Sequence, residues 1–408
     1  MMYKVKRGEV FFLKLYVFII AIYLVSFSYL YGYFPAPIFY DNSDTFMDFF
    51  HVQYWVYDQG RYIDWKSIYT PFSFWIVSLF PYPENNLNSL ELRDEGYLHL
   101  ISFYVAGLAV YLYYQSKLLL KENYIFLALA ILSAPILFLI ERGNLLFLCL
   151  LFLLISVNYY KKDLTFSIFM AMAISLKIYL FPLLFIPLLR LEFLKIILTL
   201  AFVILFNVIS ADIIGESDWL IFIDNIFEFS SEPRLYEWSY FTFSYLNISD
   251  SFLYVYPKFN DLAFTINVIV LPTVAILYFF ASVKYFFSSN QDKEKYRDTL
   301  FLLLIMLIMI IVKNAGGYVF VLLMPFLSSL IINRFSLYMF LFMILPVEIT
   351  IFQLDAVLYN NLSFVSGEAH DIPRDLTSGM ILRPVLFLIM YFFVAINFLL
   401  KNSKYKNA

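Results

Sequence analysis

The chain has 408 residues, of which 62% are hydrophobic and only 14% are charged, and its formal net charge is −3. A soluble domain of this length normally carries close to twice that share of charged residues, which excludes a water-soluble globular fold. The single cysteine, Cys149, excludes an intramolecular disulfide and a zinc site built on several cysteines.

Apolar stretches of membrane-spanning length recur along the whole chain. They are continuous and rich in Leu, Ile and Phe, without the alternation of apolar and polar residues typical of a membrane β-barrel. We therefore expect an all-α, polytopic integral membrane protein with one transmembrane domain over residues 1–408 and about 12 membrane helices, several of them short. The expected spans lie near residues 11–33, 97–116, 123–140, 144–160, 164–177, 178–190, 196–211, 262–283, 299–312, 315–333, 335–353 and 380–400.

The first apolar stretch follows Lys4, Lys6 and Arg7 and so has the general form of a signal peptide. It is too long for one, and no small-x-small cleavage site follows it. We interpret it as a retained first helix.

Basic residues are concentrated in alternate loops, which predicts the orientation in the membrane. Placing both termini in the cytoplasm makes the inner loops basic, which orients the chain. We expect the protein in the inner (plasma) membrane of a bacterium, with its site facing the exterior. The outer loops, near residues 35–96, 212–261 and 354–379, are then long and acidic, and the first is rich in aromatic residues that suit the membrane interface. The inner-loop residues are Lys117, Lys121, Lys161, Lys162, Arg190, Lys195, Lys284, Lys293, Lys295, Arg297, Arg334, Lys401, Lys404 and Lys406.

Acidic residues directly after the first span are candidate catalytic groups. Asp44 lies one helical turn before Asp48, so the two carboxylates share a helix face, and such pairing raises one pKa toward the working range of a general base. We predict Asp48 and Asp44 as catalytic residues, and Asp41, Tyr69 and Arg61 as substrate-binding residues. Capping of a short interfacial helix is the structural alternative for Asp41.

Three cations fall at outer helix ends, where a charge in an apolar chain is costly and usually functional. Arg142, Lys177 and Lys313 are predicted to bind the phosphate of a lipid-linked donor, because Lys and Arg neutralise the charge that grows on a phosphate leaving group. Glu141 and Asn144, which flank Arg142, are predicted to contact substrate. The alternatives are a simple pair between Arg142 and Glu141, and lysines that extend to the headgroups without a catalytic role.

The segment DTFMDFFHVQYWVYDQGRYIDWKSIYTPFSFWIVSLFP, residues 44–81, resembles the first outer loop of glycosyltransferase family 87. That family comprises polyprenyl-phosphate-mannose-dependent mannosyltransferases of GT-C fold. Its loop has an Asp before an aromatic stretch, then a Gly, then Tyr-Pro-Pro. Asp48, Gly60 and Tyr69-Thr70-Pro71 match this order, with Thr70 in place of the first Pro.

Three later segments extend the resemblance to roughly residues 40–330. ERGNLLFLCLLFLLI, residues 141–155, is similar to a Gly-Gln-x-Asn segment before a Leu-rich helix, although the Gln is absent. SLKIYLFPLLFIPLL, residues 175–189, is similar to an Ala-Leu-Lys-x-x-Pro turn and matches Lys177. KNAGGYVFVLLMPFL, residues 313–327, resembles the late outer turn. The resemblance implies an inverting transferase of GT-C fold with Asp48 as catalytic base and Lys177 on the phosphate. The departures at Thr70 and Arg142 mean that the donor sugar need not be mannose.

The sequence predicts a membrane glycosyltransferase that moves a hexose from a polyprenyl-phosphate sugar to a glycolipid or oligosaccharide acceptor on the outer face. The alternatives are a surface-polysaccharide (O-antigen) polymerase, which would be expected to use a large Arg-rich late loop, and a lipid-linked sugar transporter or flippase, which tends to show internal repeats. Membrane lipid is an expected partner and nucleic acid is not. No nucleotide motif occurs and no cofactor is expected, although the acidic residues leave a divalent metal open.

Overall fold

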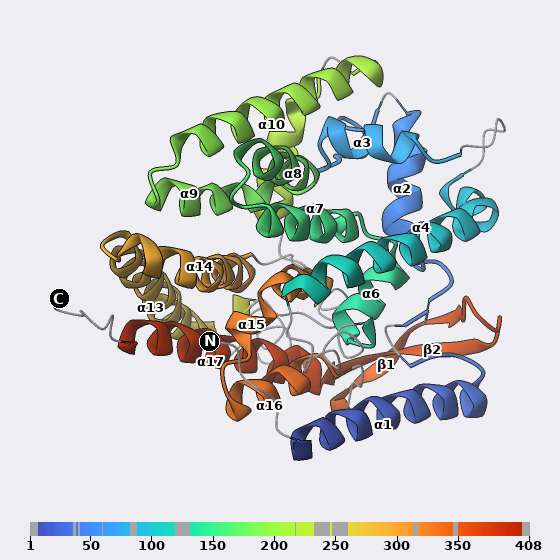
Figure 1. Cartoon of the computed structure of the whole chain (residues 1–408). Coiled ribbons are helices and arrows are strands. Elements are labelled where there is room, and N and C mark those ends of the chain that lie inside the picture. The colour runs from blue at the N-terminus through green and yellow to red at the C-terminus, as the bar shows by residue number, and fades with distance from the viewer. Residues whose placement is uncertain are drawn as a thin grey trace.

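The computed structural model describes residues 7–35, 38–39, 41–58, 60–81, 88–118, 131–216, 218–231, 245–246, 260–312, 317–345 and 350–401. Helices dominate these residues (Figure 1). In chain order the elements are α1(Arg7–Tyr31), α2(Met47–Val56), α3(Pro71–Ser78), α4(Ser89–Leu118), α6(Ala134–Arg142), α7(Leu146–Asn158), α8(Asp163–Leu176), the 3-10 helix η2(Ile178–Leu184), α9(Phe185–Leu189), α10(Phe193–Ile213), α11(Ile221–Ser231), α13(Asn260–Phe286), α14(Asn290–Ile311), the 3-10 helix η5(Gly317–Phe326), α15(Leu327–Leu330), α16(Arg334–Met343), β1(Thr350–Leu362), β2(Ala369–Thr377) and α17(Ser378–Leu400).

Five described helices are long and apolar enough to cross a membrane, and they belong to α1, α4, α10, α13 and α17. Their outward faces carry large exposed apolar side chains, such as Phe18 on α1, Ile204 on α10 and Phe279 on α13. Surfaces of this extent are stable only when lipid covers them. The chain is therefore a multi-pass membrane protein, as its composition predicts.

Several of the expected spans are helices too short to cross a bilayer by themselves. The 14 residues of α8 rise about 21 Å, against a hydrocarbon core of about 30 Å. The expected span at 178–190 is instead η2 followed by α9, with Pro182 inside η2. The expected span near 123–140 lies partly outside the described residues, and α6 covers only its end. The predicted number of about 12 spans is thus not established by the described residues.

Residues 335–353 do not form the predicted span. Here α16 ends at Met343, and β1 begins at Thr350 and pairs with β2 in an antiparallel hairpin. Much of the expected loop 354–379 is this hairpin. The fold class is all-α, as expected, and this single two-stranded hairpin among the described residues is an addition that the sequence does not predict. At the hairpin turn, Phe364 packs against Phe39 and Phe46, and Leu362 O accepts a hydrogen bond from Asn42 N (2.8 Å).

The central helices α7 and α8 are joined by a short turn and connect two chemically different ends of the molecule. At one end, Glu192 accepts hydrogen bonds from Tyr160 (2.5 Å) and Arg190 (2.8 Å), and Lys195 pairs with Asp163 (3.1 Å). Arg190 also pairs with Glu294 at 3.3 Å. These residues come from loops predicted to be cytoplasmic, so the basic loops do gather together.

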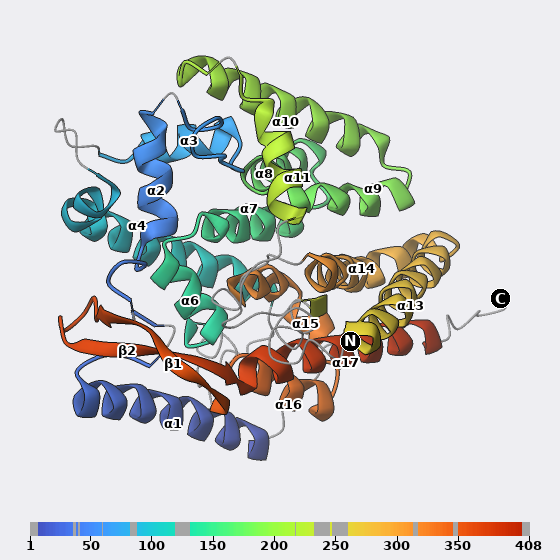
Figure 2. The ribbon, with the colours of Figure 1, turned by 180° about the vertical axis from the view of Figure 1, so that it is seen from behind.

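The views from front and back agree on this two-ended arrangement. In Figure 1 the α9–α10 turn, the α13–α14 turn and the end of α17 lie at the left, whereas α2 and the β1–β2 turn lie at the right. Figure 2 shows the same separation reversed, with α1 beside the hairpin and far from α10. The other ends of α7 and α8 therefore lie on the side that carries α2 and its carboxylates.

Candidate active site

The segment that carries the acidic cluster turns sharply before α2. The Asp41 carboxylate accepts hydrogen bonds from Ser43 N (2.7 Å) and Ser43 Oγ (2.6 Å), and Thr45 N donates to Asp41 O (2.9 Å). Such Asx turns fold a short polar segment locally. Asp41 thus shapes the turn before α2 but does not cap that helix, whose N-cap residue is Phe46, so the structural alternative of a helix cap is not borne out for α2.

Phe46, directly before α2, has a left-handed backbone with φ of 65°. This conformation costs a residue with a Cβ about 1–2 kcal/mol. The surroundings offset the cost, because Phe46 N donates to Glu141 O (2.7 Å) at the end of α6 and its ring is fully buried. The turn places Asp44 and Asp48 on the same side, toward α6.

The end of α6 supplies the partners of these two carboxylates. Arg142 Nη2 lies 2.7 Å from Asp48 Oδ1, and Arg142 Nη1 is paired with Asp44. Asn144 Nδ2 donates to the other oxygen of Asp48 at 2.7 Å. Asn144 Oδ1 accepts from Leu146 N (2.9 Å), which fixes the amide orientation. Both oxygens of Asp48 are therefore held, and Arg142 bridges the two acids.

Glu141 takes a separate part in the same junction. Its carboxyl accepts a hydrogen bond from Thr45 Oγ1 (3.1 Å), so it is not the partner of Arg142 that the alternative interpretation assumed. Burial raises the pKa of Glu141 well above its ordinary value, and the nearby charge of Asp48 adds to the shift, against the hydrogen bond from Thr45. The site therefore favours the protonated form of Glu141 more than water does.

Lys177 reaches the cluster from the end of α8. Its ammonium lies 4.4 Å from the centre of the Tyr69 ring, and its charge acts on Asp48. Thr70 Oγ1 donates to Ser175 O, which ties the first loop to α8 next to Lys177. Thr70 also accepts from Ser73 N (3.4 Å) as the N-cap of α3. The threonine that departs from the family pattern thus has a structural role.

Burial raises the pKa of Asp48 from 3.8 to about 6, although the hydrogen bond from Asn144 and the charge of Lys177 act in the opposite direction. The side chain nevertheless keeps 18% of its surface exposed, and that of Asp44 keeps 41%. Asp48 is thus held in place, can be reached by a small polar group, and gains or loses a proton near neutral pH.

The structure brings together most of the predicted site residues, but not all. Asp44, Asp48, Glu141, Arg142, Asn144, Tyr69 and Lys177 meet as described. Arg61 is buried elsewhere: it donates to Val56 O and Asp58 O, both at 2.9 Å, and so caps the end of α2. Lys313 lies outside the described residues.

Two contributors have no signal in the sequence. Tyr104 is one aromatic among many in an apolar span, yet its hydroxyl donates to Asn144 O at 3.3 Å. Thr45 is an ordinary loop residue that binds both Asp41 O (2.8 Å) and Glu141. In the part of the chain that the structure describes, no group of three or more His, Cys, Asp or Glu side chains could hold a metal ion.

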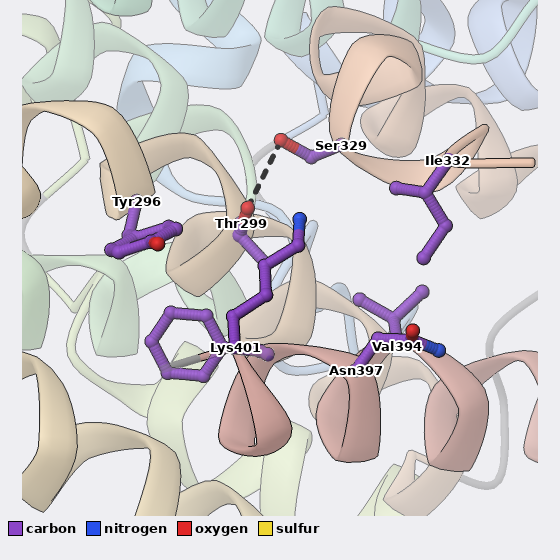
Figure 3. Close-up of a pocket in the computed structure, with 8 residues that line it drawn as sticks. Tyr296, Thr299, Ser329, Ile332, Val394, Asn397 and Lys401 are labelled. Atoms are coloured by element: carbon purple, nitrogen blue, oxygen red, sulfur yellow. Dashed lines mark hydrogen bonds between the residues drawn. The ribbon is translucent and has the colours of Figure 1, made fainter. Parts of the chain in front are cut away.

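A small pocket at the other end of the molecule does not suit a sugar. It has a volume of about 20 Å³ and lies between α14, α15 and α17, where Thr299 and Ser329 are hydrogen-bonded at 3.2 Å (Figure 3). That volume holds about one water molecule. The pocket is therefore no competing substrate site.

Comparisons of the chain with protein-family models, with curated proteins and with solved structures gave no match.

Gly143 makes the close approach between the two halves of the site possible. It ends α6 with φ of 67°, and a Cβ there would lie 2.8 Å from Phe46 O. We expect Gly143→Ala to destabilise the protein by about 3 kcal/mol, from backbone strain plus the clash. Gly215 has the same φ of 67° with nothing within 4 Å, so Gly215→Ala should cost only about 1 kcal/mol. Thermal unfolding of the two variants in nanodiscs measures these losses of stability. Equal decreases in the unfolding temperature would contradict this role of Gly143.

Proposed function

We propose that the chain is a membrane glycosyltransferase of the GT-C type that transfers a hexose from a polyprenyl-phosphate sugar to a glycolipid or oligosaccharide acceptor. The observation that carries the proposal is the environment of Asp48. Arg142 and Asn144 hold the two oxygens of this carboxylate at 2.7 Å, and burial raises its pKa to about 6. A general base works best when its pKa lies near the operating pH.

In the proposed reaction, Asp48 accepts the proton of the acceptor hydroxyl as that oxygen attacks the anomeric carbon of the donor. The bond between this carbon and the phosphate oxygen breaks, and both electrons leave with the phosphate. Negative charge therefore grows on the phosphate. Among the described residues, we assign the ammonium of Lys177 to neutralising this charge. A single displacement of this kind inverts the configuration at the anomeric carbon.

Arg142 takes a different role in this proposal from the one that the sequence predicts. Both of its terminal nitrogens face carboxylates, so Asp44 and Asp48 already balance its charge. We assign it to positioning Asp48, with Asp44 as the second anchor of the guanidinium. Binding of the donor phosphate by Lys313 stays a prediction.

The membrane arrangement supports a lipid-linked donor. The α8 helix separates the basic network from Lys177 by only about 21 Å. If the network lies at the cytoplasmic headgroups, as the positive-inside rule predicts, the site lies on the outer side of the bilayer, just below the outer headgroups. A polyprenyl chain could then stay in lipid while its phosphate reaches Lys177. The location of the site on the outer side of the membrane and the number of about 12 membrane spans are part of this proposal.

The test incubates the purified protein in lipid nanodiscs with a panel of polyprenyl-phosphate hexoses and glycolipid acceptors. Transfer should occur with at least one donor, and Lys177→Ala should raise the donor KM more than tenfold, whereas Lys177→Arg should retain part of the affinity. Lys293→Ala, in the first turns of α14 at the other end of the molecule, is the control. Vectorial movement of the donor lipid without transfer would favour a flippase instead.

The rate should depend on pH through the ionisation of Asp48. Its folded pKa of about 6 lies above the ordinary 3.8, and the base is active only when ionised. We expect kcat/KM to rise between roughly pH 5 and pH 7, with half its maximum near 6. Because folding disfavours the ionised form, this group's contribution to stability should fall as pH rises from about 4 to 6. A rate independent of pH in this range would argue against Asp48 as the base.

A further inference from the structure

Three aromatic side chains form a stepped surface beside the site. The rings of His51 and Trp55 are 5.8 Å apart with planes inclined by 20°, and those of Trp55 and Trp65 are 6.1 Å apart and inclined by 26°. Parallel faces in van der Waals contact are about 3.5–4.0 Å apart, so centres near 6 Å apart mean that the rings are offset. His51 is exposed, Trp55 is half-buried and Trp65 is 48% exposed. We call these three residues the aromatic terrace.

The surrounding chain fixes the orientation of the aromatic terrace. Trp65 Nε1 donates to Asp58 Oδ2 at 2.6 Å, and the other oxygen of Asp58 accepts from Gly60 N (2.8 Å). Tyr54 packs edge-on against Trp65 with its ring centre 6.1 Å away. The buried Arg61 holds the turn by donating to Asp58 O. These side chains are therefore already ordered before a ligand binds, which lowers the entropic cost of binding.

The terrace continues the face of α2 that carries the proposed base. Asp48, His51 and Trp55 stand at positions i, i+3 and i+7, and residues at this spacing share one side of a helix. The rise of α2 places Trp55 about 10 Å from Asp48 along the axis. One end of a ligand that lies on the aromatic terrace therefore points toward Asp48.

The charges around the terrace disfavour an anionic ligand. Asp58 and the exposed Asp64 are acidic, and the two described cations of this turn both face carboxylates: Lys66 is paired with Glu228, and Arg61 lies 3.7 Å from Glu216. Burial lowers the pKa of His51, so its imidazole is neutral near pH 7. Phosphate headgroups meet net negative charge here. A neutral sugar instead offers C–H groups to the electron-rich ring faces and hydroxyl donors to the carboxylates.

We infer that the aromatic terrace binds a neutral oligosaccharide, the part of the acceptor next to the hydroxyl that receives the new sugar. This inference rests on the proposed function and names the class of acceptor. It implies an elongating enzyme that adds hexose to an existing uncharged glycan. The offset rings provide successive platforms for linked sugar rings, while the last hydroxyl extends toward Asp48.

Kinetics with a glycolipid acceptor provide the first test. At saturating donor, Trp65→Ala and Trp55→Ala should each raise the acceptor KM about tenfold, the scale of one aromatic contact, with kcat and donor KM little changed. Trp65→Phe should restore part of the affinity. Trp219→Ala, which removes a tryptophan packed on Phe222 in α11, should leave the acceptor KM unchanged. Equal acceptor KM values for wild type and both terrace variants would overturn the inference without touching the proposed transfer.

Direct binding separates the terrace from catalysis. Mannotriose, maltotriose and a galactose trisaccharide would be titrated into the protein in nanodiscs without donor, with wild-type fluorescence compared against Trp65→Phe. Saturable binding that Trp65→Ala weakens about tenfold supports the inference even if no donor is ever turned over. Quenching of Trp65 by brominated lipid, with no trisaccharide binding, would place the terrace in the bilayer interface and overturn it.

Discussion

Replacing Asp48 by asparagine is expected to lower the rate of sugar transfer by about 10²–10⁴-fold, the usual contribution of a general base. Asparagine keeps the size of the side chain and an oxygen that can accept from Arg142, but it cannot take the proton of the acceptor hydroxyl. Initial rates at saturating donor and acceptor measure this loss. Donor KM should change little, because no described contact joins Asp48 to the proposed phosphate site except through the charge of Lys177.

The matched control is Asp261→Asn, an exposed aspartate in the first turn of α13. It removes the same charge without touching the cluster and should retain full activity. Asparagine at position 48 presents an amide NH₂ to either Arg142 or Asn144, so a loss of about 1–3 kcal/mol of stability is expected. Thermal unfolding shows whether the variant is folded at the assay temperature. Full transfer by folded Asp48→Asn protein would remove Asp48 from the mechanism.

Long uniform apolar runs made much of the membrane core predictable. The predicted spans near 11–33, 196–211, 262–283 and 380–400 correspond to α1, α10, α13 and α17, because a run of about 20 apolar residues has one low-energy form in lipid. The 3-10 segments were not predicted. Pro182 and Pro325 lie inside η2 and η5, and proline removes a helix hydrogen bond, so these residues were the available signal.

The β1–β2 hairpin is a segment whose secondary structure cannot be predicted from neighbouring residues alone. The apolar run from 335 extends the hydropathy signal toward the start of β1, which makes one span the simplest expectation. Strand formation there depends on pairing with residues 369–377, and no window of adjacent residues contains that partner. The packing of Phe364 against Phe46 likewise joins residues more than 300 positions apart.

The sequence predicts which residues form the site better than it predicts which of their side chains contact each other. The orientation from basic loops put Asp48, Arg142 and Lys177 on one side, and the structure does bring them together. The sequence could not show that Arg142 faces two carboxylates, because Asp48 and Arg142 are 94 positions apart. Nor could it show that Arg61 caps α2. The contact of Arg142 with both carboxylates depends on the left-handed turn at Phe46 and the approach of Gly143.

Replacing Arg142 by methionine is expected to destabilise the protein and to raise the pKa of Asp48. Removing one partner of a buried ion pair costs about 3–5 kcal/mol, and the partial exposure of Asp44 favours the lower end. Without the guanidinium, Asp44 and Asp48 repel each other, and a neighbouring like charge favours the protonated form. The acid limb of kcat/KM should therefore move from about pH 6 to higher pH, with activity at pH 7 reduced and partly regained at pH 8–9.

A second substitution distinguishes positioning from simple loss of packing. Asp44→Asn in the Arg142→Met background removes the repulsion, so the double variant should be more stable than Arg142→Met and its acid limb should return toward that of wild type. In wild type, Asp44→Asn should instead destabilise, because it removes a partner of Arg142. Additive effects of the two substitutions on unfolding and on the acid limb would show that Arg142 does not control Asp48. Because the bridge joins the two segments that hold the proposed base, strong coupling is the expected result.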